Sequence, residues 1–295
     1  MTTTKGIILA AGRGTRLMPA TLSASKPLLP VYDKPMIYYP LENLIRMGIK
    51  DILFIVQEDD LLIFQKIFGS GKHVGLNFSY EIQKEQRGIA DAYFIAENFL
   101  DNSPSVLALS DNVFLGKKFI DFAISAKEKM INSGSSIFGL LVADPEKFGV
   151  IELDQNDKII DIEEKPSKPK SNLINPGMYF FDSDASYYAK SLKPSSRGEL
   201  EITDLIKTYL NNQKLELQKL DKSIIWHDAG NADALLDASN KVQKYETENN
   251  IIVGSYEIAA FEKNLIQLSD LDNIAEKFIK SDYGKRMKNY INDYQ

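Results

Sequence analysis

Short runs of apolar residues alternate with stretches that carry apolar residues at helical spacing throughout the first half of the chain. The apolar runs predict buried β-strands, because a strand that is covered on both faces needs no polar side. They lie at residues 6–10, 51–56, 76–83, 105–109 and 136–142. The helical stretches lie at residues 36–47, 60–68, 89–99 and 119–131. This alternation predicts an α/β fold: a wound, mostly parallel sheet flanked by helices.

The pattern changes in the second half of the chain. Apolar segments at 149–153 and 158–162 flank a polar turn at 155–157, which predicts an inserted β-hairpin. The remaining elements are a strand at 175–181 and helices at 200–210, 232–245 and 274–290, the last broken near Tyr283 and Gly284. We expect a single domain over residues 1–295, with an α/β core up to about residue 250. Residues from about 251 to 295 form an appended helical segment, which we expect at an interface.

Composition excludes several classes of protein. The 295 residues include no cysteine, which rules out disulfides, thiolate zinc sites and thiol chemistry. A net charge of -6 argues against binding a nucleic acid polymer, which needs a basic surface. Apolar runs are too short for a membrane helix of ~20 residues, so no membrane partner is expected. The polar start, followed by a short apolar run, does not resemble a secretory signal. We therefore expect a cytoplasmic protein.

A glycine-rich loop follows the first predicted strand. Its sequence is Leu9-Ala10-Ala11-Gly12-Arg13-Gly14-Thr15-Arg16. Small residues let the backbone approach a triphosphate, and successive N–H groups can bind the phosphate oxygens. A structural turn is the alternative reading, because Gly-x-Gly alone is a weak signal. The loop lacks both the third glycine of a dinucleotide fingerprint and the Gly-Lys-Ser/Thr of a P-loop, which disfavours those two kinds of site.

Two cations favour phosphate chemistry over a simple turn. Arg16 lies just past the glycines, and Lys26 stands in Ser25-Lys26-Pro27-Leu28-Leu29-Pro30. Each alone reads as a solvated surface charge. Near a phosphate-binding loop, however, a guanidinium and an ammonium suit a polyphosphate and its leaving pyrophosphate.

These segments, together with the stretch from Val31 to Leu41, resemble the signature of sugar nucleotidyltransferases, and especially the glucose-1-phosphate thymidylyltransferases. Later segments are similar to the same family and follow in the same order over roughly nine-tenths of the chain. They are Ser110-Asp111-Asn112-Val113-Phe114, Phe148-Gly149-Val150, Glu163-Glu164-Lys165-Pro166, Gly177-Met178-Tyr179-Phe180-Phe181-Asp182, Arg197-Gly198-Glu199-Leu200-Glu201-Ile202-Thr203 and Trp226-His227-Asp228-Ala229-Gly230.

The resemblance carries expectations about fold and reaction. It implies a Rossmann-like, GT-A-like nucleotidyltransferase sheet, dependence on Mg²⁺, and a homo-oligomer, either a dimer or a tetramer. The implied reaction joins dTTP to α-D-glucose 1-phosphate and gives dTDP-glucose and pyrophosphate. Such products serve dTDP-sugar and polysaccharide biosynthesis. The phosphate-binding loop then contributes Leu9, Ala11, Gly12, Gly14 and Thr15 to the substrate site, with Arg16 and Lys26 as catalytic cations.

Two aspartates are candidate metal ligands. Asp111 follows the strand at 105–109, and Asp228 follows the apolar run Ile224-Ile225-Trp226. Carboxylates at adjacent strand ends can hold Mg²⁺ against substrate phosphates. Taken alone, both residues read better as turn or cap aspartates. The resemblance places metal ligands at these two positions and favours the metal site.

The resemblance also assigns residues to the sugar and to the base. It implies that Lys165 contacts the sugar phosphate, with Glu164 and Gly149 at the sugar hydroxyls. Gln83 and Gly88 are expected at the nucleobase, where an amide can bond the pyrimidine edge. Asn112 and Tyr179 are the remaining substrate-binding candidates. Without the resemblance, Lys165 reads as part of an exposed charged loop and Gln83 as a surface glutamine. His227 neighbours Asp228 along a strand and is expected to point away from the site and pack.

Several positions depart from the family pattern and leave alternatives open. Ala11 stands where thymidylyltransferases usually carry glycine, which leaves UTP open as the nucleotide. Asn175-Pro176 and Asn231-Ala232 differ near the sugar pocket, which leaves another hexose 1-phosphate open. The segment Glu257–Phe261 lacks a usual Trp-Arg pair, so we expect altered feedback inhibition. A non-catalytic nucleotide-sugar sensor and a nicotinamide dehydrogenase are the rivals from other classes.

Overall fold

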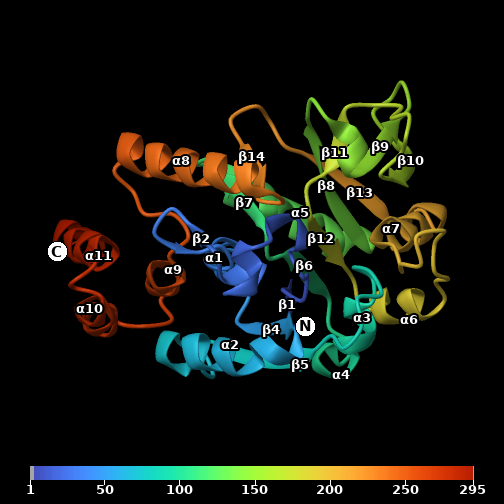
Figure 1. Ribbon diagram of the computed structural model, residues 1–295. Coiled ribbons are helices and arrows are strands. Elements are labelled where there is room, and N and C mark those ends of the chain that lie inside the picture. Colours follow the sequence, from blue (N-terminus) through green and yellow to red (C-terminus); the bar gives the residue numbers. More distant parts are fainter. Residues whose placement is uncertain (1–2, 295) are drawn as a thin grey trace.

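The computed structural model describes residues 3–294 and contains a large mixed sheet of ten strands (Figure 1). Across the sheet the strands follow one another as β10 (Ile159–Glu164), β9 (Gly149–Leu153), β11 (Leu173–Asn175), β8 (Ser135–Leu141), β12 (Met178–Phe181), β6 (Ser105–Leu109), β1 (Lys5–Leu9), β4 (Asp51–Val56) and β5 (Asn77–Ile82). The tenth strand, β13 (Leu215–Lys219), pairs with β8 in parallel. The α/β class and the wound, parallel core predicted from sequence are confirmed.

One half of the sheet is parallel. Strands β6, β1, β4 and β5 run in the same direction, with Gly6 opposite Val106 on one side and Ile52 on the other. The alternating residues of β1 and β4 point to opposite faces, where both faces are buried. This is the reason that these strands read as unbroken apolar runs in the sequence.

The sheet reverses direction at β12, which is antiparallel to both β6 and β8. The predicted hairpin is confirmed, since β9 and β10 pair in antiparallel fashion. The prediction of one strand at 175–181 is wrong, because the chain forms β11 and β12 with a break between them. Pro176 has no N–H to donate, and Gly177 adopts a φ of +76° and donates its N–H to Asn175 Oδ1, so the strand is interrupted at these two residues.

Two small two-stranded sheets lie beside the large one. The first pairs β2 (Pro30–Val31) with β3 (Lys34–Pro35), just after the predicted phosphate-binding segment. The second pairs β7 (Asn112–Leu115) with β14 (Ile225–Asp228), and it sets Asp228 directly opposite Asn112. Residues that are more than a hundred positions apart thereby come together next to the end of β6.

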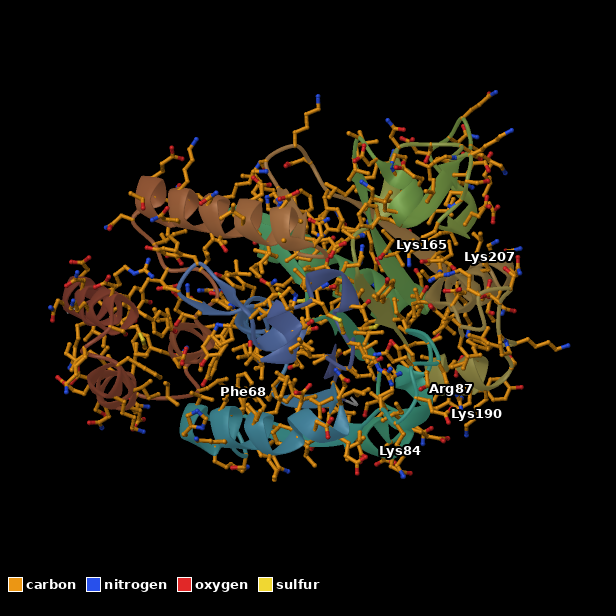
Figure 2. All side chains as sticks on the ribbon, viewed as in Figure 1. Phe68, Lys84, Arg87, Lys165, Lys190 and Lys207 are labelled. Atoms are coloured by element: carbon orange, nitrogen blue, oxygen red, sulfur yellow. The ribbon has the colours of Figure 1, made fainter. Side chains whose placement is uncertain are left out.

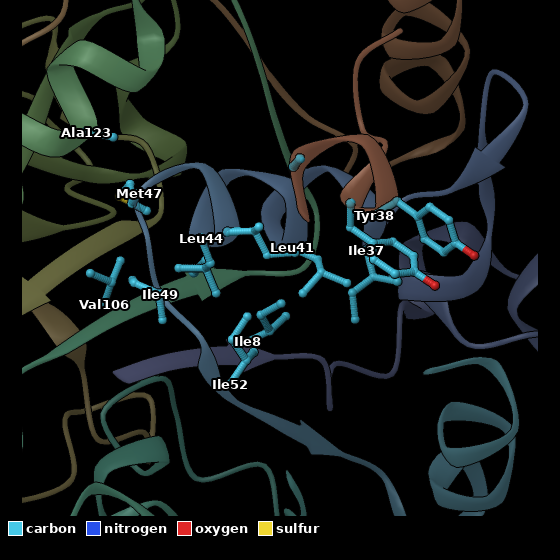
Figure 3. Packing of buried hydrophobic residues seen from close by; sticks show 14 of the residues in the cluster. Ile8, Ile37, Tyr38, Leu41, Leu44, Met47, Ile49, Ile52, Val106 and Ala123 are labelled. Atoms are coloured by element: carbon cyan, nitrogen blue, oxygen red, sulfur yellow. The ribbon is translucent and has the colours of Figure 1, made fainter. Parts of the chain in front are cut away.

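Helices cover both faces of the sheet. One face, which carries Ile8 and Ile52, packs against helices α1 (Tyr38–Arg46), α2 (Leu61–Phe68), α5 (Phe119–Ser133) and α9 (Tyr256–Glu262). Figure 3 shows these two isoleucines beneath Leu41 and Leu44 of α1. The other face, which carries Ile7 and Leu53, packs against α3 (Ala92–Ile95), α4 (Glu97–Leu100), α6 (Ala185–Lys190) and α7 (Ile202–Asn211). The region predicted as one helix at 89–99 is thus two short helices.

The last part of the chain is helical, as predicted. It contains α8 (Ala232–Asn249), α9, α10 (Leu268–Lys277) and α11 (Asp282–Tyr294), with α10 and α11 at the opposite side of the molecule from the β9–β10 hairpin (Figure 1). The break predicted near Tyr283 and Gly284 lies earlier, at residues 278–281, and these two residues lie in the first turn of α11. A side chain at Gly284 would strike the Phe278 carbonyl, so glycine permits this tight connection.

Buried charges attach these helices to the core. Glu246 of α8 lies 3.1 Å from the Lys34 ammonium and also pairs with Arg286 of α11, which in turn pairs with Asp33. Buried side chains of α9 and α11 belong to the same hydrophobic cluster as Ile8 of β1. Residues 251–294 therefore pack onto the sheet domain itself. None of the helices in the described part of the chain is long and apolar enough to cross a membrane.

Candidate active site

An open cavity of about 870 Å³ lies at the carboxyl ends of β1 and β6 and extends toward the β9–β10 hairpin. Ligands of wound α/β sheets bind at this edge. The predicted site residues that line the cavity are Leu9, Gly12, Gly14, Thr15, Arg16, Lys26, Gln83, Gly88, Asp111, Asn112, Gly149, Glu164, Lys165, Tyr179 and Asp228. Ala11 is the exception: it is fully buried, and its carbonyl accepts a hydrogen bond of 2.9 Å from Gln86 Nε2.

The glycine-rich loop closes tightly over Lys26. Gly14 has a φ of +61°, and a Cβ at this position would lie 2.9 Å from Lys26 Cβ and from Thr21 Cγ2. Any side chain there would push the loop away from the lysine. Gly12, by contrast, faces open space, with no atom within 4 Å of a Cβ built on it. A phosphate group can approach the backbone there. Gly14 directly precedes the short helix Thr15–Leu17, which carries Arg16 into the cavity.

The two predicted metal ligands lie together, with Lys26 between them. Lys26 Nζ is 2.5 Å from Asp111 Oδ2 and 3.9 Å from Asp228 Oδ1. Asp111 is held from its other side, because Asn112 Nδ2 donates to Asp111 Oδ1 at 3.0 Å. Trp226 Nε1 donates to Asn112 Oδ1 at 2.7 Å, which fixes that amide in turn. The pairing of β7 with β14 therefore sets the geometry of both carboxylates.

The environment of Asp228 is unusual for an aspartate. Burial, together with the neighbouring Asp111 carboxylate, raises the pKa of Asp228 to about 6, against the opposing effect of Lys26, Arg16 and Lys165. Gly230 keeps Arg16 close: a Cβ there would lie 3.1 Å from both Arg16 Nη2 and Asp228 Oδ2. Two like charges held in a partly buried site are typical of a site that binds a cation.

These carboxylates fit a divalent metal ion. Asp228 Oδ1 is buried and has no hydrogen-bond partner among the described residues, so an acceptor oxygen is left free beside Asp111. Residues 3–294 contain no group of three acidic or histidine side chains that could hold a metal by themselves. Mg²⁺ commonly binds one or two carboxylates and takes its other ligands from phosphates and water. The donor set here corresponds to that kind of site.

The hairpin end of the cavity presents the residues predicted for the sugar phosphate. Lys165 follows β10 with a φ of +44°, rare for a lysine, and its N–H donates to the Phe148 carbonyl at 3.0 Å. Such strain is typical of a functional position. Glu164 lies beside it, and burial raises the pKa of its carboxyl. The absence of a side chain at Gly149 keeps space open at this end, because a Cβ at that position would lie 3.0 Å from Thr203 Cγ2 and 3.6 Å from Glu164 Oε2.

The opposite end holds the residues predicted for the nucleobase. Gln83 follows β5 and is 8% exposed, with its Nε2 donating to Asp91 Oδ2 at 3.1 Å. Gly88 has a φ of +106°, and a Cβ there would lie 2.4 Å from the Leu200 carbonyl oxygen. Figure 2 shows the two ends apart, with Lys165 near the hairpin and Arg87, which neighbours Gly88, near the short helices α3 and α4.

Sequence reasoning missed several residues that line the cavity. Three are cations: Arg13, Lys147 and Arg197. Arg197 Nη1 lies 3.7 Å from Glu164 Oε1, at the end of the cavity predicted to bind the sugar. It belongs to a segment that resembles the family, so its position in the sequence was a usable signal. Six cationic and four acidic side chains line the cavity, although the chain as a whole carries a charge of -6. The cavity is therefore locally suited to anionic substrates.

His227 contributes to the cavity wall and packs toward α8. Its Nδ1 lies 3.5 Å from Asp237 Oδ2, and its Nε2 is buried without a hydrogen-bond partner among the described residues. Burial lowers the pKa of His227, and Lys241 adds to this effect. The imidazole contacts a neighbouring helix, which agrees with the predicted packing role, but the prediction that it points away from the site is wrong, because His227 also lines the cavity.

Comparison with known proteins assigns the chain to a family. The sequence model of the nucleotidyl transferases matches residues 5–245. A glucose-1-phosphate thymidylyltransferase from Xanthomonas campestris pv. campestris is 45% identical and covers 97% of this chain and 96% of that protein. One from Mycobacterium tuberculosis is 41% identical, covering 95% of this chain and 96% of that protein.

Solved structures agree with this assignment. A crystal structure from Bacillus anthracis, named as a putative glucose-1-phosphate thymidylyltransferase in complex with a sucrose, superimposes with a TM-score of 0.74 at 38% identity. It covers 81% of this chain and 95% of that protein. A UDP-glucose pyrophosphorylase at 24% identity, with a TM-score of 0.72, supports the fold alone. By sequence model, by near full-length identity and by fold, this chain belongs to the nucleotidyl transferase family, among the glucose-1-phosphate thymidylyltransferases.

Proposed function

We propose that this enzyme joins dTTP to α-D-glucose 1-phosphate and releases dTDP-glucose and pyrophosphate. The observation that carries the proposal is the convergence of Arg16, Lys26 and Lys165 with Asp111 and Asp228 in one cavity. Gln83, which we propose to contact the nucleobase, lies on one side of this group. Glu164, which we propose to contact the sugar, lies on the other. Two anionic substrates can therefore meet at the charged centre of the cavity.

The proposed reaction is a single in-line displacement. A phosphate oxygen of the sugar 1-phosphate attacks the α-phosphorus of the nucleotide, and the bond from that phosphorus to the bridging oxygen of pyrophosphate breaks. Arg16 stabilises the negative charge that develops on the leaving pyrophosphate, while Lys26 and Lys165 hold the reacting phosphates. The attacking oxygen is already anionic at neutral pH, so no residue has to act as a strong base.

Nucleotidyltransferases of this kind generally use a divalent metal. We propose that the metal is Mg²⁺ and that Asp111 and Asp228 hold it. When bound, the ion neutralises phosphate charge and aligns the two substrates. The free, buried Asp228 Oδ1 and the absence of a third acidic ligand among residues 3–294 support a metal that takes its other ligands from phosphate and water.

The test is pyrophosphate release in the presence of Mg²⁺ and glucose 1-phosphate, measured with dTTP, UTP, CTP, ATP and GTP in turn. We expect a clear preference for dTTP. If the enzyme prefers UTP, then UTP takes the place of dTTP as the proposed substrate, an alternative that Ala11 left open. Release with none of the five, under conditions where the protein is folded, would contradict the proposed nucleotidyl transfer to glucose 1-phosphate.

A second candidate is the same reaction with another hexose 1-phosphate. Asn175, Pro176 and Asn231, which differ from the usual family pattern, all line the cavity. Asn175 lies opposite Gly149 in the sheet, beside a residue proposed for the sugar hydroxyls, so a change there can alter which hydroxyl groups are accepted. A panel of hexose 1-phosphates with dTTP separates the two candidates. A kcat/KM that is highest with a sugar other than glucose would favour the second.

We also propose that the enzyme is a cytoplasmic homo-oligomer and that the helical segment from residue 251 takes part in the subunit interface. Phe278 and Ile279, between α10 and α11, are each 38% exposed, which leaves apolar area available for a second copy. Light scattering after size-exclusion chromatography gives the number of subunits. A monomeric mass at micromolar concentration would contradict this proposal.

A further inference from the structure

Gln83 is held from behind by a residue outside the cavity. Asp91 precedes helix α3, is 5% exposed and does not line the cavity. Its Oδ2 atom accepts the 3.1 Å hydrogen bond from Gln83 Nε2. Its Oδ1 atom lies 3.0 Å from Arg87 Nη2. Both carboxylate oxygens therefore have partners, and Arg87 balances the charge.

This contact determines which way the Gln83 amide faces. A glutamine amide has one acceptor oxygen and one nitrogen with two hydrogens, and either end can in principle face a ligand. A carboxylate accepts hydrogen bonds and has no hydrogen to give. Turning the amide over would set Oε1 against Asp91 Oδ2, two acceptors in a buried position, which is unfavourable. Nε2 therefore faces Asp91.

The orientation leaves two groups of Gln83 for a ligand. Oε1 accepts no hydrogen bond within residues 3–294 and remains available as an acceptor, and the second hydrogen on Nε2 remains available as a donor. An acceptor beside a donor is complementary to a base edge that offers a ring N–H beside a carbonyl oxygen. Thymine and uracil have such an edge. Cytosine offers the reverse pattern, an unprotonated ring nitrogen beside an amino group.

We propose that Asp91 is a positioning residue that fixes the Gln83 amide and thereby makes the enzyme reject cytosine nucleotides. The proposal rests on the proposed function, in which Gln83 contacts the base. Asp91 touches no substrate and acts through Gln83. Arg87 supports it by holding the second carboxylate oxygen, so that Asp91 cannot rotate away from the amide.

The variant Asp91→Asn tests this role because it keeps the shape of the side chain and adds a donor. The amide introduced by this substitution can donate to Gln83 Oε1, which allows the Gln83 amide to turn over and offer its NH₂ group to the cavity. The measurement is competition between dTTP and dCTP in one reaction, with the two products separated and counted. The product ratio gives the ratio of kcat/KM values and does not depend on how much of the variant is folded.

We expect Asp91→Asn to narrow the preference for dTTP over dCTP by roughly tenfold or more, since an unpaired polar group in a binding site is a strong discriminator. The change should arise from a higher KM for dTTP and a lower KM for dCTP, with kcat for dTTP nearly unchanged. Asp182→Asn is the matched control. Asp182 accepts from Tyr209 OH at 2.6 Å and does not line the cavity, so its variant should keep the wild-type ratio.

A double variant shows whether the effect passes through Gln83. In a Gln83→Ala background there is no amide to orient, so adding Asp91→Asn should leave the dTTP to dCTP ratio unchanged. The inference is overturned if Asp91→Asn alone keeps the wild-type ratio, or if it alters the ratio equally without Gln83. Wild-type enzyme that does not use dTTP at all would instead contradict the proposed function, so the two failures are distinguishable.

Discussion

Lys26 donates a 2.5 Å hydrogen bond to Asp111, although the two residues are 85 positions apart in the chain. The lysine side chain is 9% exposed, and the aspartate side chain is 23% exposed. The same ammonium lies 3.9 Å from Asp228, so a single cation balances two carboxylates that lie close together. The side chain that we propose to hold the reacting phosphates therefore also balances the charge of two carboxylates in the folded protein.

We expect Lys26→Met to lower kcat by a hundredfold or more, because a preorganised charge on the reacting phosphates is lost. It should also lower the free energy of unfolding by roughly 2–4 kcal/mol, since it removes the nearest counter-charge from two partly buried carboxylates. Lys190→Met is the control: Lys190 pairs with Glu97 at the same distance of 2.5 Å but is 48% exposed. In urea unfolding, the free energy of unfolding of this control should lie within about 0.5 kcal/mol of the wild-type value. A stable, active Lys26→Met enzyme would contradict both roles.

Asp111→Asn removes one of the two proposed metal ligands and preserves the side-chain shape. We expect turnover to fall by orders of magnitude, with thermal unfolding close to that of the wild type, because the amide oxygen can still accept from Lys26. Steady-state kinetics over a wide range of Mg²⁺ concentration provide the measurement. Near-wild-type activity at saturating Mg²⁺ would remove Asp111 from the metal site.

Asp228 makes metal-free stability depend on pH. Its pKa of about 6 in the folded protein lies above the ordinary value of 3.8, so folding favours the protonated form. The resulting stabilisation is present below about pH 4 and is lost as the pH rises through about 6. We therefore expect Asp228→Asn to stabilise EDTA-treated protein at pH 8 by roughly 1–3 kcal/mol while abolishing activity. Urea unfolding at pH 4 and pH 8 checks this, and an equal effect at both values would contradict it.

Gly88→Ala tests the close backbone contact at the end of the cavity that we propose for the nucleobase. The substitution forces a side chain onto a φ of +106° and sets Cβ 2.4 Å from the Leu200 carbonyl oxygen. We expect the KM for dTTP to rise at least tenfold and the free energy of unfolding to fall by roughly 2–4 kcal/mol. The substitution strains the φ angle of residue 88 and also forces the backbone around Leu200 to move. Gly48→Ala is the control for φ alone, since Gly48 has a φ of +82° and open space around a Cβ. Equal effects in the two variants would show that the close approach does not matter.

Glu246→Gln tests how the C-terminal helices are attached. Glu246 is 2% exposed and is the shared partner of Lys34 and Arg286. Losing its charge leaves Lys34 and Arg286 to share the one carboxylate of Asp33, which should lower the free energy of unfolding by roughly 3–5 kcal/mol. Glu248, on the same helix, forms an exposed pair with Lys244 at 3.8 Å. Glu248→Gln should therefore unfold at the wild-type urea concentration, and a similar loss in both variants would argue against a special role for Glu246.

Much of the sheet was predictable because its central strands are apolar on both faces. Strands β4 and β6 match the predicted ranges 51–56 and 105–109, and the hairpin was marked by its polar turn. Strand β13 was not predicted. Its sequence Leu215-Glu216-Leu217-Gln218-Lys219 alternates apolar and polar residues over only four positions, the shortest run on which alternation indicates a strand, and sequence reasoning missed it. The strand pairs in parallel with β8.

The candidate site was predictable to a similar degree and for a different reason. The glycine loop and its cations have a physical meaning on their own, whereas Gln83 and Lys165 became candidates through the family resemblance. The roles of Asp91 and Arg87 could not be predicted from the sequence, because these residues contact other side chains and do not line the cavity. Ala11 illustrates the opposite case: its place in the motif suggested a substrate contact, but its side chain is fully buried.

The reversal of strand direction at β12 has a consequence for how such an enzyme can diversify. The groups proposed for base recognition come from the parallel half before β12, and those proposed for the sugar phosphate come from the antiparallel half around β9 and β10. The two halves meet at Asp111 and Asp228. Substitutions in one half can therefore change the preferred sugar without disturbing the preferred base, so long as the meeting point is retained.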